Sequence, residues 1–450
     1  MSRKIIVFVS SGTVILAVLF FGLLNKQTVS NSYTNVATTQ QSSMPTSPSG
    51  EVLPAVDALP EQQAMVTGAG GDAGKKQSED PSDVKTRLLK HSIYFGTYLA
   101  DADVKVEAPR PANFLTEISK YFDLYSIPAW FHHVEFKGPG QFDFSAPDKD
   151  ADWAVSQGAK LHMHNLIWHE FLPQWLTGGS FTPQQLADIM KTHIQTVVKH
   201  YMDKYPGSVL AWDVVNEPIA TAYSKSGTYD AETGLLKTIW SDIHKPGSSD
   251  PSDYIQLAFE WAHEIDPKVQ LYINEYDIEY KGKKWDQLYA LAKHLKDKGV
   301  PITGIGFQCH VDSHYGHPFT EFLSNMNSLA DLGLQCQVTE MDVMVASEHV
   351  LPWKASPVML GAPSLQNELQ NQARVYKGFL DACLQAKNCN AFIIFGAWDP
   401  GSSQNRHWKD GSGNFLGPFF PNILDENMQP KPAFNAIANE VDSKISAQNK

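Results

Sequence analysis

The sequence from about Pro81 to the C-terminus predicts an α/β fold, an eight-stranded (β/α)8 barrel of the TIM type. Short apolar or β-branched runs alternate with longer stretches of helical period, which is typical of parallel strands joined by crossover helices. Eight such units over about 360 residues fit one closed barrel with large loops better than two smaller domains.

The predicted strands are short and end in polar residues. In chain order they are Ile93–Leu99, Phe122–Ser126, Lys160–Asn165, Leu210–Glu217, Gln270–Asn274, Gly304–His310, Leu334–Glu340 and Asn390–Gly396. Between strands, the stretch Thr182–Lys204 carries apolar residues at helical spacing. Thr182-Pro183 and Asp250-Pro251 each place a capping residue before a proline, so each predicts a helix start.

The composition limits the class of protein. A hydrophobic content of 42% supplies one large core and excludes disorder throughout the chain. A formal net charge of -13 argues against nucleic acid as a partner, because such binders need a basic surface to neutralise phosphates.

The N-terminal residues 1–25 predict an export signal. Arg3 and Lys4 precede an apolar run from Ile5 to Leu24, which is long enough to cross a bilayer as a helix. It is a cleaved signal peptide or an uncleaved signal anchor, and we favour the anchor because no small-x-small cleavage site follows Leu24. The protein is therefore expected outside the cytoplasm, secreted or held at the membrane by this helix.

Residues 26–82 are rich in Ser, Thr, Gln, Pro and Gly and contain few large apolar residues. Such a segment cannot bury enough surface to fold, so we interpret it as a flexible tether ahead of a folded domain at 83–450.

Four cysteines are present. Cys383 and Cys389 are close in sequence, and such a pair in an exported protein is a plausible disulfide. Cys309 and Cys336 lie in apolar stretches and are expected to be buried thiols. No second cysteine or histidine pair stands nearby at ligand spacing, so we predict no metal site.

Two carboxylates at strand ends stand out, Glu217 at the end of the fourth predicted strand and Glu340 at the end of the seventh. In (β/α)8 barrels the reacting groups stand at the carboxyl ends of the strands. A carboxyl pair suits cleavage of a glycosidic bond, since one group protonates the leaving oxygen while the other attacks the sugar or activates water. Either residue alone could instead form a structural ion pair.

Several motifs, in order along the chain, resemble glycoside hydrolase family 10, the retaining endo-β-1,4-xylanase family. They are Phe95-Gly96-Thr97, His164-Asn165-Leu166-Ile167-Trp168-His169, Leu172-Pro173-Gln174-Trp175, Trp212-Asp213-Val214-Val215-Asn216-Glu217, Asn274-Glu275-Tyr276, Gly304-Ile305-Gly306-Phe307-Gln308, Thr339-Glu340-Met341-Asp342, and Asp425-Glu426-Asn427 ahead of Pro430-Lys431-Pro432-Ala433-Phe434. Together they cover most of Ile93–Ala438.

The resemblance implies a function and a set of roles. Glu217 is expected to be the acid/base and Glu340 the nucleophile, acting on a β-linked polysaccharide or oligosaccharide without a metal or organic cofactor. Asn216 is expected to bind the sugar 2-hydroxyl, and His310 with Asp342 to hold the nucleophile. His164, Trp168 and Gln308 are expected to line the reacting sugar. The family's usual disulfide also falls at Cys383 and Cys389.

The sequence departs from the family on the glycone side of the cleft. The family's Glu-Asn-x-x-Lys set after strand two is replaced by Pro128–His133, and its Trp-Gly after strand eight by Phe395-Gly396, with Trp398 as an expected replacement floor. Insertions at Gly227–Ser248 and His349–Ser364 are expected near the same face. Ordinary xylan is then expected to be a poor substrate. The alternative is a carbohydrate-binding barrel whose hydrolytic activity is weak or lost.

Overall fold

The computed structural model describes residues 8–10, 13–15, 83–99, 110–313, 316–345, 365–402 and 420–448. The chain divides into two units, residues 1–68 and 69–450. In the first unit, β1 (Phe8–Ser10) pairs antiparallel with β2 (Thr13–Ile15). These pieces of the expected N-terminal helix are thus strands, in line with their β-branched residues. In the described part of the chain, no helix is long and apolar enough to cross a bilayer. The remainder of 1–25 and the predicted linker at 26–82 lie outside the described residues.

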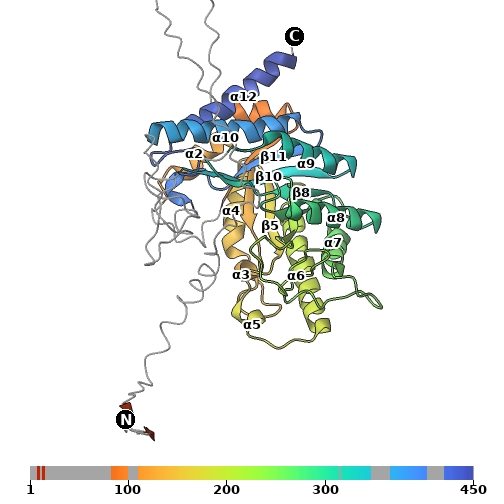
Figure 1. Cartoon of the computed structure of the whole chain (residues 1–450). Coiled ribbons are helices and arrows are strands. Elements are labelled where there is room, and N and C mark those ends of the chain that lie inside the picture. Colours follow the sequence, from red (N-terminus) through yellow and green to blue (C-terminus); the bar gives the residue numbers. More distant parts are fainter. Residues whose placement is uncertain are drawn as a thin grey trace, which may run out of the picture. The chain divides into compact units, whose positions relative to one another are not determined.

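The second unit is a closed barrel of eight parallel strands, as predicted (Figure 1). Each strand pairs with its neighbours in chain order. The last strand pairs both with the strand before it and with the first strand, which closes the sheet. The strands are β3 (Tyr94–Tyr98), β4 (Leu124–Pro128), β5 (Lys160–Ile167), β6 (Val209–Asn216), β7 (Gln270–Glu275), β8 (Gly304–Phe307), β10 (Gln335–Met344) and β11 (Cys389–Ile394). A short extra strand, β9 (His310–Asp312), pairs with the far end of β10.

Helices surround the barrel and connect its strands. α10 (Leu365–Gln385) and α12 (Pro432–Gln448) run side by side along one edge (Figure 1). The other helices are α1 (Val84–Leu89), α2 (Phe114–Tyr121), α3 (Phe131–Val134), α4 (Ser145–Ser156), α5 (Gln174–Thr177), α6 (Pro183–Lys204), α7 (Asp253–Ile265), α8 (Lys283–Asp297) and α9 (Phe319–Asp331), with the 3₁₀ turn η3 (Asp399–Gly401).

One of the two predicted helix starts is correct. Thr182 caps α6, its hydroxyl accepting from the Gln185 backbone N–H while the Gln185 side chain bonds back to Thr182. The other was wrong, because α7 begins at Asp253 rather than after Asp250. The Asp250 carboxylate accepts from the Ser252 backbone N–H and hydroxyl, which holds a turn ahead of the helix instead.

The register of the central strands brings polar side chains together in the barrel. Asn216 of β6 pairs with Asn274 of β7, which in turn pairs with Gly306 of β8. A Cβ atom at Gly306 would lie 2.6 Å from the Asn274 side-chain oxygen and 2.7 Å from a Thr339 methyl. Glycine at this position therefore leaves room for the Asn274 and Thr339 side chains inside the barrel.

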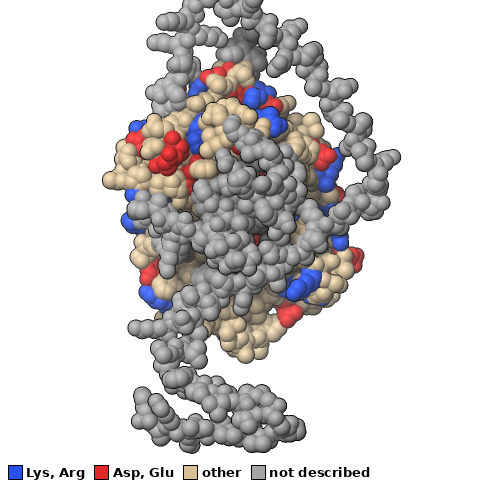
Figure 2. Space-filling view, turned by 60° about the vertical axis from the view of Figure 1, so that its left-hand side comes forward, with Lys and Arg blue, Asp and Glu red and all other residues tan. Residues whose placement is uncertain are grey.

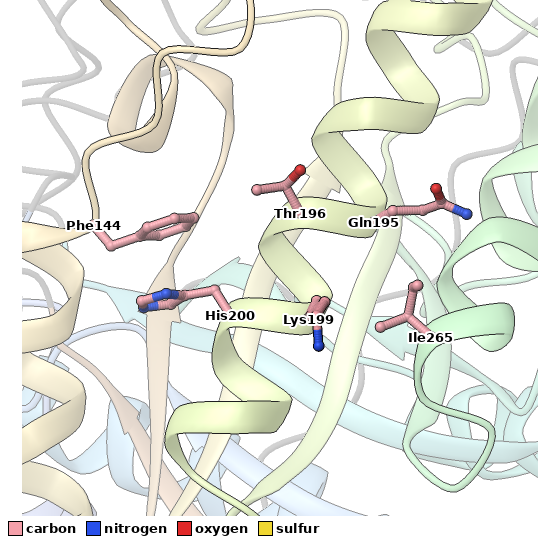
Figure 3. Close-up of a pocket in the computed structure, with 6 residues that line it drawn as sticks. All are labelled: Phe144, Gln195, Thr196, Lys199, His200 and Ile265. Carbon is pink, nitrogen blue, oxygen red and sulfur yellow. The ribbon is translucent and has the colours of Figure 1, made fainter.

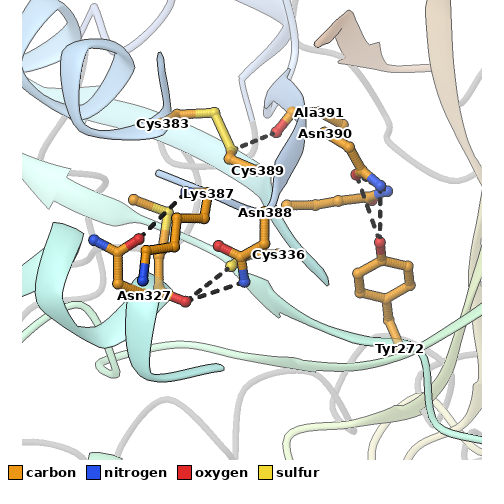
Figure 4. The surroundings of a disulfide bond; sticks show 11 residues. Tyr272, Asn327, Cys336, Cys383, Lys387, Asn388, Cys389, Asn390 and Ala391 are labelled. Carbon is orange, nitrogen blue, oxygen red and sulfur yellow. Dashed lines mark hydrogen bonds between the residues drawn. A yellow bond between two sulfur atoms is a disulfide. The ribbon is translucent and has the colours of Figure 1, made fainter. Parts of the chain in front are cut away.

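The predicted disulfide is present and the other two cysteines are buried free thiols, as expected. The bond joins Cys383 near the end of α10 to Cys389 at the start of β11, with Cα atoms 5.4 Å apart (Figure 4). Between them, the Asn388 side chain donates to the carbonyls of Met326 and Leu334. The disulfide and these bonds together fix how the chain enters the last strand.

Figure 2 shows how charges are distributed on one face of the molecule. On this face, the described acidic and basic side chains are scattered among uncharged ones. Among the described residues visible there, Lys and Arg do not gather into one patch.

Candidate active site

The two predicted carboxylates both stand on central strands of the barrel. Glu217 directly follows β6, in a left-handed backbone conformation with φ of 54°. Its backbone N–H donates to the Asn274 carbonyl at 2.9 Å, which anchors the turn to β7. Glu340 lies within β10 and is 7% exposed. The strand therefore continues past the nucleophile predicted at its end.

The carboxyl of Glu217 is half-buried and held from two sides. The Trp168 indole N–H donates to one oxygen at 3.0 Å, and the Gln308 amide donates to the other at 2.9 Å. Loss of hydration and the nearby Glu275 carboxylate raise the pKa of Glu217 to about 8, against the lowering effect of the Gln308 bond. A carboxyl with this pKa keeps its proton at neutral pH.

Glu340 has the opposite electrostatic environment. Asn274 donates to one of its oxygens at 2.6 Å, and His310 Nε2 lies 3.3 Å from the other. Burial acts to raise the pKa of Glu340, but His164 and His310 outweigh it and lower the pKa. His310 Nδ1 is in turn 3.1 Å from Asp342, and the carboxylates of Asp342 and Glu340 overcome burial to raise the pKa of His310 well above its ordinary value. Glu340 is thus held ionised.

A second histidine, His164 on β5, lies close to Glu340. His164 Nδ1 lies 2.8 Å from Asp213 and 3.9 Å from Glu340. Burial acts to lower the pKa of His164, but the Glu340 and Asp213 carboxylates outweigh it and raise the pKa. His162 also binds Asp213 at 2.8 Å, and the two histidines overcome burial to lower the pKa of Asp213 to about 2. Asp213 is therefore a buried anion that orients His164.

Asn274 links the predicted residues, although sequence reasoning did not place it in the site. Its amide donates to both Asn216 and Glu340, at 3.0 and 2.6 Å, and its oxygen accepts from the Thr339 hydroxyl at 2.6 Å. Its place at the end of an apolar strand was the available signal, but these bonds depend on the register of β6, β7 and β10.

An aromatic wall, Trp130, Trp168 and Phe171, flanks the two carboxylates. Trp130 lies within the stretch Pro128–His133 that was predicted to depart from the family, with its ring centroid 5.9 Å from Trp168 and 5.5 Å from Phe171. Trp168 and Phe171 stack at 5.0 Å. These rings touch each other directly, so no ring of a ligand fits between them. Phe171 is 43% exposed, so the wall presents an aromatic surface to solvent.

The predicted insertion after β6 supports this wall from behind. Within Gly227–Ser248, Trp240 is buried and its indole N–H donates to the Trp168 carbonyl at 2.9 Å. Its ring also stacks on Phe131 at 5.5 Å, and Phe131 is buried. The second insertion, His349–Ser364, lies outside the described residues.

The structure does not bring Trp398 to the other predicted residues. Its side chain is 4% exposed, packs against Phe114 at 6.1 Å and donates from its indole N–H to the Glu426 carbonyl. The aromatic residue beside His310 is instead Phe395, whose ring meets His310 edge-on at 5.1 Å and lies 4.9 Å from the Tyr98 ring.

Two other kinds of candidate site among the described residues would be a metal centre and a surface pocket. They contain no group of three His, Cys, Asp or Glu side chains able to hold a metal ion. A surface hollow lies along α6, where Phe144 stacks on His200 at 3.8 Å (Figure 3). None of the predicted site residues lines it.

Comparisons with known proteins agree with this geometry. The family model "Glycosyl hydrolase family 10" matches residues 94–440. Endo-1,4-beta-xylanase B of Thermotoga neapolitana is 35% identical over 305 residues, 68% of this chain and 76% of that protein. Endo-1,4-beta-xylanase A of Thermoanaerobacterium saccharolyticum is 33% identical over 307 residues, 66% of this chain but only 23% of that longer protein.

Solved structures resemble the barrel closely. Native xylanase 10B from Thermotoga maritima is 28% identical, with a TM-score of 0.66, covering 81% of this chain and 99% of that one. Xylanase 10B from Thermotoga petrophila, solved in complex with xylobiose, gives the same identity and TM-score over 80% and 98%. With a family match over most of the barrel and paired carboxylates on its central strands, the chain belongs to glycosyl hydrolase family 10.

Proposed function

We propose that this chain hydrolyses β-1,4-linked xylan or a closely related glycan by double displacement with retention, with Glu217 as acid/base and Glu340 as nucleophile. Supporting this, several relatives are named endo-1,4-β-xylanases, and a solved neighbour of similar fold binds xylobiose. The family is that of an O-glycosyl hydrolase, which fixes the class of reaction.

The observation that carries the proposal is the opposite shift of the two carboxyl pKa values. Glu217 has its pKa raised to about 8, while that of Glu340 is lowered. Two neighbouring carboxyl groups whose surroundings shift their pKa values in opposite directions are the usual sign of an acid and a nucleophile in one site. At neutral pH, Glu217 has a proton to give and Glu340 has a charge with which to attack.

The two steps follow from these charges. Glu340 attacks the anomeric carbon while Glu217 protonates the departing oxygen, which leaves a glycosyl ester on Glu340. The Glu340 charge is one cause of the raised pKa of Glu217, and ester formation removes it. Glu217 then loses its proton more readily and can activate the water that cleaves the ester.

Asn216 is suited to bind the reacting sugar. Its side-chain oxygen accepts from Asn274, which fixes the orientation of the amide. Within the described part of the chain, its buried amide nitrogen has no hydrogen-bond partner. A buried donor without a partner is costly, so we assign it to the sugar 2-hydroxyl.

The test is reducing-sugar release by the full chain on a panel of xylans and other β-glycans, beside Glu340→Ala and Glu217→Ala. Both variants are expected to lose activity by orders of magnitude, and NMR of the first product should show the β-anomer. Initial release of the α-anomer would refute retention. Binding of a glycan with no turnover by the parent would favour the carbohydrate-binding alternative.

For location, we keep the proposal that residues 1–25 direct export, with 26–82 as a tether. The basic residues ahead of the apolar run Ile5–Leu24 support it. Fractionation of expressing cells tests this, since a protein found only in the cytoplasm would refute export.

A further inference from the structure

A buried carboxyl that the proposed mechanism does not use lies behind the site. Glu279 follows β7 and is 2% exposed. In the described part of the chain, no lysine, arginine or histidine forms an ion pair with it. Burial and the nearby Asp277 raise its pKa to about 7, against the effects of backbone N–H donors and Lys284. Burying a carboxyl without a cation partner is costly, so its neighbours indicate what it does there.

Glu279 holds the short segment between β8 and β9. One of its oxygens accepts from the Cys309 backbone N–H at 2.8 Å. Cys309 is fully buried and has a φ of 59°, a left-handed conformation that is uncommon for a residue with a side chain. The bond to Glu279 gives the Cys309 backbone N–H a hydrogen-bond partner. Without it, this donor would be buried at the turn with no partner.

The loop that carries Glu279 is itself fixed to the scaffold. The Asn325 side chain, buried on α9, donates to the carbonyls of Ile278 and Glu279 at 3.1 and 3.4 Å. The Glu279 carboxyl that accepts from Cys309 therefore belongs to a loop that is hydrogen-bonded to α9. Because these bonds go to backbone carbonyls, a substitution of the Glu279 side chain leaves their acceptors in the chain.

The two residues next to Cys309 each bond one of the proposed catalytic carboxyls. Gln308 donates to Glu217 at 2.9 Å, and His310 Nε2 is 3.3 Å from Glu340. The left-handed turn at Cys309 sets the directions of both side chains. A displacement of this backbone would lengthen both bonds at once, and loss of about 1 Å of alignment in a site can cost about 100-fold in rate.

We propose that Glu279 is a positioning residue: its bond to the Cys309 amide holds the turn that aims Gln308 at Glu217 and His310 at Glu340. This inference rests on the proposed function. Glu279 does not touch the reacting atoms, and its effect is carried by the backbone between β8 and β9.

A matched pair of variants isolates the bond. Glu279→Gln and Glu279→Met have similar size and no charge, but only glutamine keeps an oxygen that can accept from the Cys309 N–H. On 4-nitrophenyl β-xylobioside, Glu279→Gln is expected to keep kcat/KM within about threefold of the parent, and Glu279→Met to lose about tenfold or more, mostly in kcat. Equal activities in the two variants would overturn the proposal.

The pH profile separates positioning from a loss of folded protein. Gln308 lowers the pKa of Glu217, and His310 lowers that of Glu340. Weakening these bonds in Glu279→Met should raise both pKa values. The acidic limb of the kcat/KM profile, set by Glu340, and the alkaline limb, set by Glu217, should therefore both move to higher pH. A drop in activity with both limbs unmoved would show a merely structural role and overturn the proposal.

A crystal structure of Glu279→Met tests the inference without activity. It should show the Gln308–Glu217 and His310–Glu340 distances increased, and unchanged distances would overturn the proposal even if the parent proved inactive on every glycan. If Glu279→Met does not fold, Asn325→Leu releases the same loop from α9 and is expected to move both limbs in the same direction. Limbs that stay in place in Asn325→Leu would overturn the proposal.

Discussion

Glu217→Gln is expected to stabilise the fold while abolishing hydrolysis. The pKa of Glu217 is about 8 in the folded chain, against 4.5 for an unperturbed glutamic acid. Below pH 4.5 both states are protonated and the carboxyl has no effect on stability. As pH rises from 4.5 to about 8, the unfolded state releases its proton while the folded state keeps it, so the parent loses stability over that range. Glutamine does not titrate, so the Glu217→Gln variant does not lose stability over this pH range.

The magnitude follows from the two pKa values. The difference between 4.5 and about 8 corresponds to roughly 5 kcal/mol above pH 8, at about 1.36 kcal/mol per pKa unit. This is an upper limit, because the half-buried side chain keeps some hydration. The amide of glutamine also fits the Trp168 and Gln308 bonds less well than a carboxyl. We therefore expect a gain of about 1–3 kcal/mol, or about 2–6 °C in Tm for a domain of this size.

The assay is thermal unfolding of the parent and Glu217→Gln at about pH 4, 6 and 8.5, a range that spans both pKa values. Glu340→Gln is the matched control, because the same chemical change at Glu340 has the opposite sign. The pKa of Glu340 is lowered, so its ionised form stabilises the fold at pH values above the unfolded pKa. That stability is lost as pH falls through the folded pKa, and glutamine forfeits it at high pH.

The two variants should therefore diverge as pH rises, with Glu217→Gln above the parent and Glu340→Gln below it, and the three curves should approach one another at low pH. If Glu217→Gln and Glu340→Gln differ from the parent in Tm by the same amount and sign at about pH 8.5, the opposite pKa shifts of the two carboxyls are refuted. The assignment of acid and nucleophile that rests on those shifts would then fail. A gain in Glu217→Gln that does not depend on pH would point to packing instead.

Three further changes test other parts of the structure. Gln308→Leu removes a bond that lowers the pKa of Glu217, so the alkaline limb of kcat/KM should move to higher pH; an unmoved limb would contradict the bond. Replacing Cys383 and Cys389 with serine opens a loop with a sequence separation of 6, which should cost about 2 kcal/mol in chemical denaturation without reductant, and no loss would contradict a closed bond in solution. Trp130→Ala removes one face of the aromatic wall and should raise KM on xylo-oligosaccharides several-fold by loss of stacking, whereas a change in kcat alone would contradict a binding role.

The eight strands were predictable because short runs rich in apolar or β-branched residues alternate with stretches of helical period. Their ends were less predictable. β10 continues to Met344 because the chain beyond Glu340 remains buried and pairs with β9. The predicted strand Gly304–His310 is instead split into β8 and β9, because Cys309 takes a left-handed conformation that interrupts the pairing. Nothing in its local sequence indicates this, since the bond that stabilises it comes from Glu279.

The proposed acid and nucleophile could be named from motifs, but the bonds that set their charge states could not. Gln308 and His310 stand beside the two carboxyls as the resemblance implies, whereas Asn274 joins Asn216 to Glu340 only through the register of neighbouring strands. Trp398 shows the opposite case. Its position after strand eight suggested a sugar floor, but its ring turns inward onto Phe114, and side-chain direction in a loop is set by tertiary packing.

The aromatic wall and the carboxyl pair are separable in physical terms. Trp130 contacts His164 at 5.5 Å and Trp168 at 5.9 Å, and these two residues in turn reach Glu340 and Glu217. Yet no effect of Trp130 on either carboxyl pKa is needed to account for their division, which follows from burial, Glu275 and the two histidines. Changes at the aromatic wall can therefore alter ligand binding while Glu217 and Glu340 keep their charge states.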